Sequence, residues 1–141
     1  MDLTGSLQHR AGEAIGAEAI GAKADGLITM SICAQHIGED ELSLRLVRDA
    51  RRLAHRAGHQ TVELRSYYNL GLQLFDSGRL AEAAEVFREG EQRAEEVGLG
   101  WSGYAIDLRV VHVLTMYQLG EWDRAEAAAR IAGRAVSATV G

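Results

Sequence analysis

Hydrophobic side chains recur at steps of three and four residues along most of the chain. After Gly38, one such face consists of Leu42, Leu46, Ala50, Leu53 and Ala57. After Gly78 and Gly120 the face recurs as Leu80, Ala83, Phe87, Ala94 and Val97, and as Trp122, Ala125, Ala129, Ala132 and Val136. This is the period of an amphipathic α-helix, so the pattern predicts helices throughout.

Glycines divide this pattern at nearly equal intervals. Gly16, Gly38, Gly58, Gly78, Gly98 and Gly120 are 22, 20, 20, 20 and 22 residues apart. Each interval has room for a helix of about 15 to 18 residues and a tight turn. The chain contains 16 Gly and no Pro, so glycine must end the helices by adopting a left-handed conformation. Helices are predicted over residues 6–15, 18–36, 40–57, 60–77, 80–97, 101–119 and 122–137.

The intervals differ in how apolar they are. The stretches 60–77 and 101–119 carry hydrophobic residues on two faces, as expected for helices that pack against their own partner and against the next hairpin. We therefore expect one all-α domain over residues 1–141, with about seven helices. Its hairpins are predicted over 18–57, 60–97 and 101–137, preceded by a partial helix over 6–15.

Small residues lie at matching positions of the intervals, where paired helices approach closely. Ser43, Ala83 and Ala125 match one another, as do Ala50, Gly90 and Ala132. On the inner helices of the hairpins, which are those predicted over 18–36, 60–77 and 101–119, Ser31 and Gly71 match. Val113 breaks the pattern in the third hairpin. The pattern predicts that Ala83 and Ala125 are buried at helix crossings.

The stretch YYNLGLQLFDSGRLAEAAEVF, residues 67–87, resembles a tetratricopeptide repeat. The signature positions of that repeat are occupied by Tyr67, Leu70, Gly71, Gly78, Ala83 and Phe87. The resemblance implies antiparallel hairpins stacked as a right-handed superhelix, with a concave surface that takes peptides or helices.

A second stretch, GLGWSGYAIDLRVVHVLTMYQLGEWDRAE over residues 98–126, is similar to the helical-repeat region of large ATP-dependent LuxR-type regulators. That group includes the maltose activator, and the similarity extends over roughly residues 13–136. In that family the repeats lie between a P-loop ATPase and a helix-turn-helix, and they receive an effector or a regulatory partner. The resemblance implies an effector- or partner-binding module of a transcriptional regulator.

The sequence itself carries neither neighbouring activity. It has no GxxxxGK[ST] run that could hold ATP phosphates and no basic recognition helix after Gly120. We expect either a piece of such a regulator or a small self-standing relative, and no enzyme activity or cofactor. A stand-alone scaffold or adaptor protein is the alternative function.

The composition restricts the possible partners and the cellular location of the protein. The net charge of −5 argues against a general polyanion binder, so no direct contact with nucleic acid is expected. Cys33 is the only cysteine, which suits a reducing cytoplasm, and no apolar run of about 18 residues predicts a membrane span. These features predict a soluble cytoplasmic protein.

Two clusters of reactive side chains invite a chemical interpretation. His55 and His59 have the helical spacing of two metal ligands, but Gly58 separates them and no third ligand follows at a recognisable spacing. Cys33 and His36 lie one turn apart, yet a single free cysteine is more often a small buried hydrophobe. We expect neither a metal site nor a catalytic thiolate.

Charges concentrate on two of the predicted outer helices. The helix 40–57 carries Arg45, Arg48, Arg51, Arg52 and Arg56, and the helix 80–97 carries Glu82, Glu85, Glu89, Glu95 and Glu96. One interpretation is a basic patch for nucleic acid. The favoured one is mutual neutralisation between neighbouring repeats, through exposed pairs that each contribute less than about 1 kcal/mol.

The predicted binding surface follows the inner helices. Its residues are Ile32, Gln35, His36, Tyr68, Asn69, Leu72, Phe75, Leu114, Tyr117 and Gln118. An aromatic and aliphatic strip with polar edges suits a protein or peptide partner, or a small effector. The alternative is that these side chains are buried against an adjoining repeat. The last helix is rich in alanine and poor in charge, which also predicts self-association there.

Overall fold

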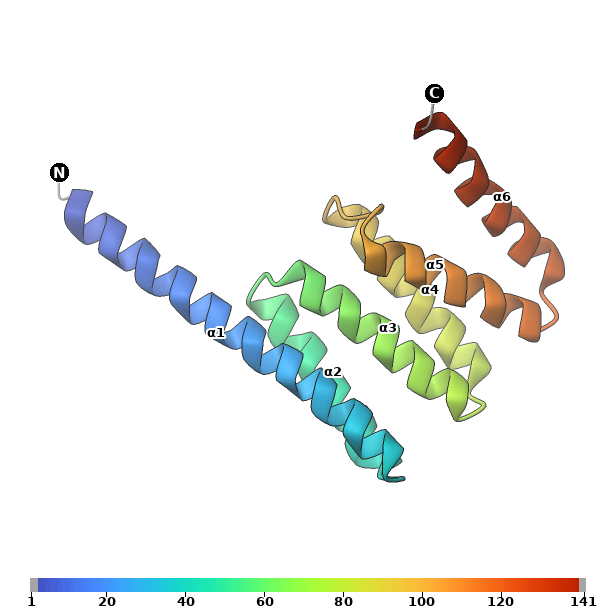
Figure 1. Ribbon diagram of the computed structural model, residues 1–141, viewed down its shortest axis with the longest axis horizontal. Helices are drawn as coiled ribbons and strands as arrows, with labels where there is room; N and C mark the ends of the chain where they lie inside the picture. The colour runs from blue at the N-terminus through green and yellow to red at the C-terminus, as the bar shows by residue number, and fades with distance from the viewer. Residues whose placement is uncertain (1–2, 140–141) are drawn as a thin grey trace. The chain divides into compact units, whose positions relative to one another are not determined.

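The computed structural model describes residues 3–139 of the chain, and the side chains of residues 5–131. All regular structure in this range is helical, and no strand occurs within it (Figure 1). The helices are α1 (Leu3–His36), α2 (Asp40–Arg56), α3 (Gln60–Asp76), α4 (Leu80–Glu96), α5 (Gly103–Gln118) and α6 (Trp122–Thr139). The all-α prediction is confirmed. Between residues 3 and 139, no helix is both long enough and apolar enough to cross a membrane.

Five of the six evenly spaced glycines form the turns. Gly38, Gly58, Gly78, Gly98 and Gly120 have φ angles of 82°, 68°, 74°, 74° and 78°. At Gly78 the amide donates to the carbonyl of Phe75 at 2.9 Å, and the next amide, of Arg79, donates to Leu74 at 2.8 Å. These two bonds close the last turn of α3 in the way that a left-handed glycine permits.

The predicted turn at Gly16 is wrong. The separate helices expected over 6–15 and 18–36 form the single helix α1, so six helices replace the predicted seven in the described range. A glycine inside a helix costs only about 1 kcal/mol relative to alanine, and Ala14, Ala17 and Ala19 beside it are the best helix formers. Without a partner for residues 6–15 to turn back onto, the helix continues through Gly16.

The helices fall into two compact units, residues 1–66 and 67–141. In the first unit α1 and α2 form an antiparallel pair, and the Ser43 hydroxyl of α2 donates to the Ser31 carbonyl of α1 at 2.6 Å. The core of this pair contains Ala24, Ile28, Ser31, Ser43, Val47, Ala50 and Ala54. Gly21 allows the ring of His59 to approach α1, because a β-carbon there would lie 2.5 Å from the ring.

The second unit contains residues 67–76 of α3 together with α4, α5 and α6. The fully buried ring of Phe87, on α4, lies directly against Gly71 of α3. Leu108 of α5 lies 3.0 Å from the position that a β-carbon at Gly90 would occupy. Ala83 and Ala125 are 0% and 5% exposed, so their predicted burial is confirmed. Right-handed stacking of all hairpins stays a prediction.

Candidate binding groove

Among the described side chains of α6, which end at residue 131, burial occurs only near the beginning of the helix. Ala125 is buried and Ala128 half-buried, but Ala129 is exposed and Ile131 is 72% exposed. Figure 1 shows α6 turning away from α5, whereas α3 and α4 run side by side. The divergence leaves a groove of about 620 Å³ bordered by α4, α5 and α6. This volume is within the usual range for ligand sites.

Apolar side chains form most of the groove wall. They are Val110, Val113 and Leu114 of α5 and Ala128, Ala129 and Ile131 of α6. Val110 and Leu114 also belong to an apolar stripe along α5, which consists of Ile106, Val110, Leu114 and Tyr117 with exposures of 45%, 53%, 54% and 62%. Residues at steps of four, four and three share one helix face. An exposed stripe of this kind on a folded protein indicates an interaction surface.

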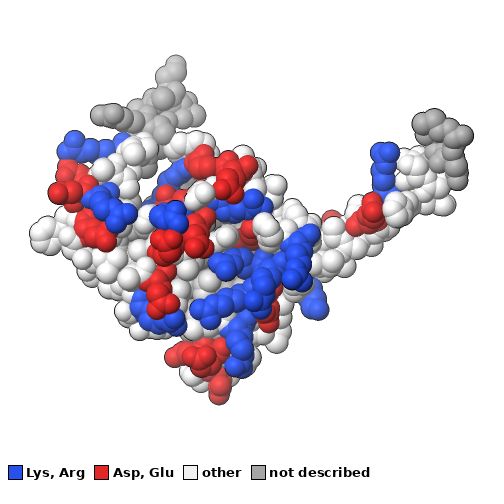
Figure 2. All heavy atoms as spheres, turned by 180° about the vertical axis from the view of Figure 1, so that it is seen from behind, with Lys and Arg blue, Asp and Glu red and all other residues white. Residues whose placement is uncertain are grey.

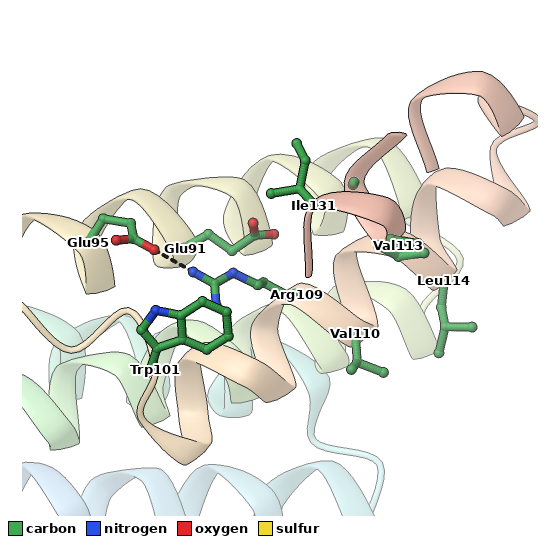
Figure 3. Close-up of a pocket in the computed structure, with 10 residues that line it drawn as sticks. Glu91, Glu95, Trp101, Arg109, Val110, Val113, Leu114 and Ile131 are labelled. Atoms are coloured by element: carbon green, nitrogen blue, oxygen red, sulfur yellow. Dashed lines mark hydrogen bonds and ion pairs between the residues drawn. The ribbon is translucent and has the colours of Figure 1, made fainter. Parts of the chain in front are cut away.

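The other end of the groove is charged. The Arg109 guanidinium lies 4.8 Å from the centre of the Trp101 ring and is ion-paired with Glu95 (Figure 3). It also donates to the Gly100 carbonyl at 2.7 Å. Glu91 borders the same end, and its carboxylate lies 2.5 Å from Nδ1 of the largely buried His112. These bonds fix the shape of the charged end, because each side chain is held by another element.

Two departures from the repeat pattern explain why the groove forms at this hairpin. Counted back from the turn glycine, Arg109 occupies the position of Tyr67, and Val113 occupies the position of Gly71. Gly71 lets Phe87 pack against the backbone of α3. A branched valine denies α6 the same approach to α5, and Arg109 brings charge to a position that is aromatic in the preceding hairpin.

The residues of the predicted binding surface lie on three helices in the two units. In the second unit, Leu114, Tyr117 and Gln118 are exposed on α5, and Leu114 lines the groove. Tyr117 also lies beside Trp122 of α6, with ring centres 6.5 Å apart. The four residues on α3, namely Tyr68, Asn69, Leu72 and Phe75, are half-buried. In the first unit, Ile32 and Gln35 are half-buried on α1 and His36 is exposed.

Tyr68 takes part in packing between α3 and α5. Its ring centre is 6.3 Å from that of Tyr104. Burial raises the pKa of the Tyr68 hydroxyl, and the nearby Asp107 carboxylate and Tyr104 raise it further. All three effects favour the neutral phenol.

Sequence reasoning missed the charged end of the groove. Trp101, Arg109, Glu91 and Glu95 were not among the predicted site residues, because nothing in the period of a helix marks residues that meet across two helices and the turn between them. The available signal was the replacement of the Tyr67-type aromatic by Arg109.

The histidines and the cysteine have local roles. His55 Nδ1 lies 2.8 Å from the buried carboxylate of Glu63, and His59 donates to the Ala17 carbonyl at 2.6 Å. Cys33 is exposed, so the expectation of a buried hydrophobe is wrong at this position. Among the residues that the structure describes, no three His, Cys, Asp or Glu side chains are grouped to hold a metal ion.

The two charged helices differ in how their charges are paired. On α4, Arg88 is bonded to Glu85 through two hydrogen bonds, which lower the pKa of the Glu85 carboxyl. Arg93 and Glu96 form a further pair within α4. On α2, Arg52 is paired with Asp49, and Figure 2 shows Lys and Arg side chains gathered in one area of the surface of the first unit. Each of these three pairs lies within one helix.

Comparison with known protein families, with curated protein sequences and with solved structures gives no match to this chain. The resemblance to tetratricopeptide repeats and to LuxR-type regulators thus stays a prediction based on residues 67–87 and 98–126.

Proposed function

We propose that the chain is a non-catalytic helical-repeat module that binds an effector or a protein partner through its second unit. The binding surface consists of the α5 stripe, Ile106, Val110, Leu114 and Tyr117, and the adjoining groove. The exposure of this stripe is the observation that carries the proposal. These apolar side chains are more than two-fifths exposed. A partner that covers them would gain about 25 cal/mol of binding free energy for each Å² of apolar surface that it buries.

The charged end of the groove supports binding rather than chemistry. Arg109 is engaged by Glu95 and by the Gly100 carbonyl, and Glu91 is engaged by His112. Side chains held in this way orient a ligand and keep the groove open. The role matches that of the repeat region in LuxR-type regulators, where a ligand biases the attached domains by differential binding. The alternative is a stand-alone scaffold or adaptor, for which the same surface serves.

A dye that fluoresces on apolar surfaces, 1-anilinonaphthalene-8-sulfonate, tests the proposal on the intact chain. Leu114→Asp places a charge in the stripe and is expected to lower the dye fluorescence by more than half. Met30→Asp is the matched control, because Met30 is 57% exposed on α1, in the other unit. Circular dichroism must show unchanged helix content for both variants. An equal loss of fluorescence in the two variants, or no loss in Leu114→Asp, would refute the proposed surface.

A further inference from the structure

The second unit already contains one helix that is docked in the way a partner could be. Helix α5 contacts both members of the α3/α4 pair. Tyr104 lies beside Tyr68 of α3, Leu108 packs at Gly90 of α4, and His112 is bonded to Glu91. A helix pair of this repeat thus receives the next inner helix between its two members.

Helix α5 carries exposed apolar residues at positions that match half-buried residues of α3. Val110, Leu114 and Tyr117 lie ten, six and three residues before Gly120, as Tyr68, Leu72 and Phe75 do before Gly78. The three α3 residues are half-buried, while the three α5 residues are exposed. The stripe from Ile106 to Tyr117 is about 16 Å long at 1.5 Å per residue, which is three turns of a helix and longer than most small effectors.

Charged residues beside the stripe restrict which partner can bind there. In the first unit Arg65 of α3 is ion-paired with Asp25 of α1 and also donates to the Asp25 carbonyl. Asp25, Arg65 and Asp107 each lie thirteen residues before their turn glycine, so they occupy one register position on successive inner helices. Asp107 is exposed and forms no ion pair within residues 5–131. Acidic and basic residues thus alternate at this position. We therefore expect a cation at the same position of a helix that docks on α5.

We propose that the α5 stripe and the groove receive an amphipathic α-helix of a partner protein that carries a Lys or Arg opposite Asp107. The proposal rests on the proposed function and names the occupant of that site. A second copy of this chain fits less well. Its α1 would bring Asp25, which is already paired with Arg65, to the register position of Asp107, so a second copy offers no cation there. Helix-in-groove recognition needs spaced apolar anchors, which the stripe supplies.

A peptide with the sequence of α5 itself is the probe. It spans residues 103–118, has its own stripe residues replaced by Gln, and is held helical by a hydrocarbon staple on that exposed side. One form carries Asp107→Arg and the other keeps Asp107. Both are labelled with fluorescein and titrated with the intact chain by fluorescence anisotropy at low ionic strength.

The wild-type chain is expected to bind the Asp107→Arg peptide about twofold to fivefold more tightly than the other, as one exposed charge pair allows. A chain with Asp107→Arg should reverse this preference, and 1 M salt should remove it. Leu114→Asp in the chain should weaken both peptides at least tenfold, while Met30→Asp changes neither affinity.

The outcomes separate the two proposals. Equal affinities, or a preference for the peptide that keeps Asp107, would overturn the proposal of a basic partner helix. If Leu114→Asp still weakens binding in that case, the proposed binding surface stands. Binding that Leu114→Asp does not weaken, or no binding of either peptide, would overturn the helix-binding site. Sedimentation that shows concentration-dependent association abolished by Leu114→Asp would assign the surface to a second copy and likewise overturn the partner.

Discussion

The substitution Gly71→Val places in the second hairpin the valine that the third hairpin has at the matching position, Val113. It tests whether Phe87 can pack against α3 only because residue 71 is glycine. In Gly71→Val the new β-carbon would lie 2.7 Å from Cζ of Phe87, far inside the normal carbon–carbon contact of about 3.5 to 4.0 Å. Phe87 is fully buried, so its ring cannot swing into solvent. Overpacking of this kind costs about 1 to 3 kcal/mol, and three added carbons against one ring place the cost near the upper limit.

Helix propensity acts in the opposite direction but is smaller. Valine is favoured over glycine in a helix by a few tenths of a kcal/mol. We therefore expect Gly71→Val to lower the free energy of unfolding by about 2 to 3 kcal/mol, measured by urea denaturation followed at 222 nm. Gly26→Val is the control, because no atom lies within 4 Å of a β-carbon there, and its effect should stay within about 0.5 kcal/mol.

A double-mutant cycle identifies Phe87 as the cause. Phe87→Ala alone leaves a cavity and should cost about 3 to 5 kcal/mol. Combined with Gly71→Val, it removes the ring that the new valine would overlap. The double variant should then be more stable than the sum of the single effects by at least about 1 kcal/mol. Strict additivity, or a stabilising Gly71→Val, would refute the packing argument.

Two further predictions concern the turns and the tyrosine. Gly78→Ala forces a β-carbon into a backbone with φ of 74° and should destabilise the protein by roughly 1 to 2 kcal/mol, whereas Gly26→Ala should stabilise it slightly; thermal melts of both variants check the contrast. Because the pKa of Tyr68 is raised, the fold favours its neutral phenol, and the stability that this adds is present below the unfolded-state pKa of about 10 and is lost as the pH rises above it. Tyr68→Phe should therefore reduce the loss of stability between pH 9 and pH 11 in urea denaturation, and an unchanged loss would contradict the assigned burial.

The turns were predictable because glycines recur at nearly equal intervals between the amphipathic stretches. Without proline, a left-handed glycine ends each helix from α1 to α5, and the five turns lie where the spacing placed them. The same rule failed at Gly16. Spacing alone does not separate a glycine that ends a helix from one that a helix tolerates, since the difference depends on whether a partner helix packs behind the turn.

The candidate site was predictable in part, for a related reason. Periodicity identified Leu114 and Tyr117 as residues of an apolar face on α5, and the structure leaves both exposed. Periodicity cannot report that Tyr68, on the matching face of α3, is half-buried beside Tyr104. Whether an apolar face is core or surface depends on the next helix, and the sequence pattern of a helix is the same in both cases.

The departures from the repeat carry more functional information than the repeat itself. Gly71 is small because Phe87 must lie against it, and Val113 at the matching position removes that approach. Once α6 is held away, the side chain that replaces the Tyr67-type aromatic no longer needs to be apolar, and Arg109 can pair with Glu95 at the border of an open groove. A hairpin that gives up tight pairing loses packing energy, since each uncovered side chain loses its contacts. A partner helix that fills the groove would restore those contacts, which is why binding should be sought at this hairpin.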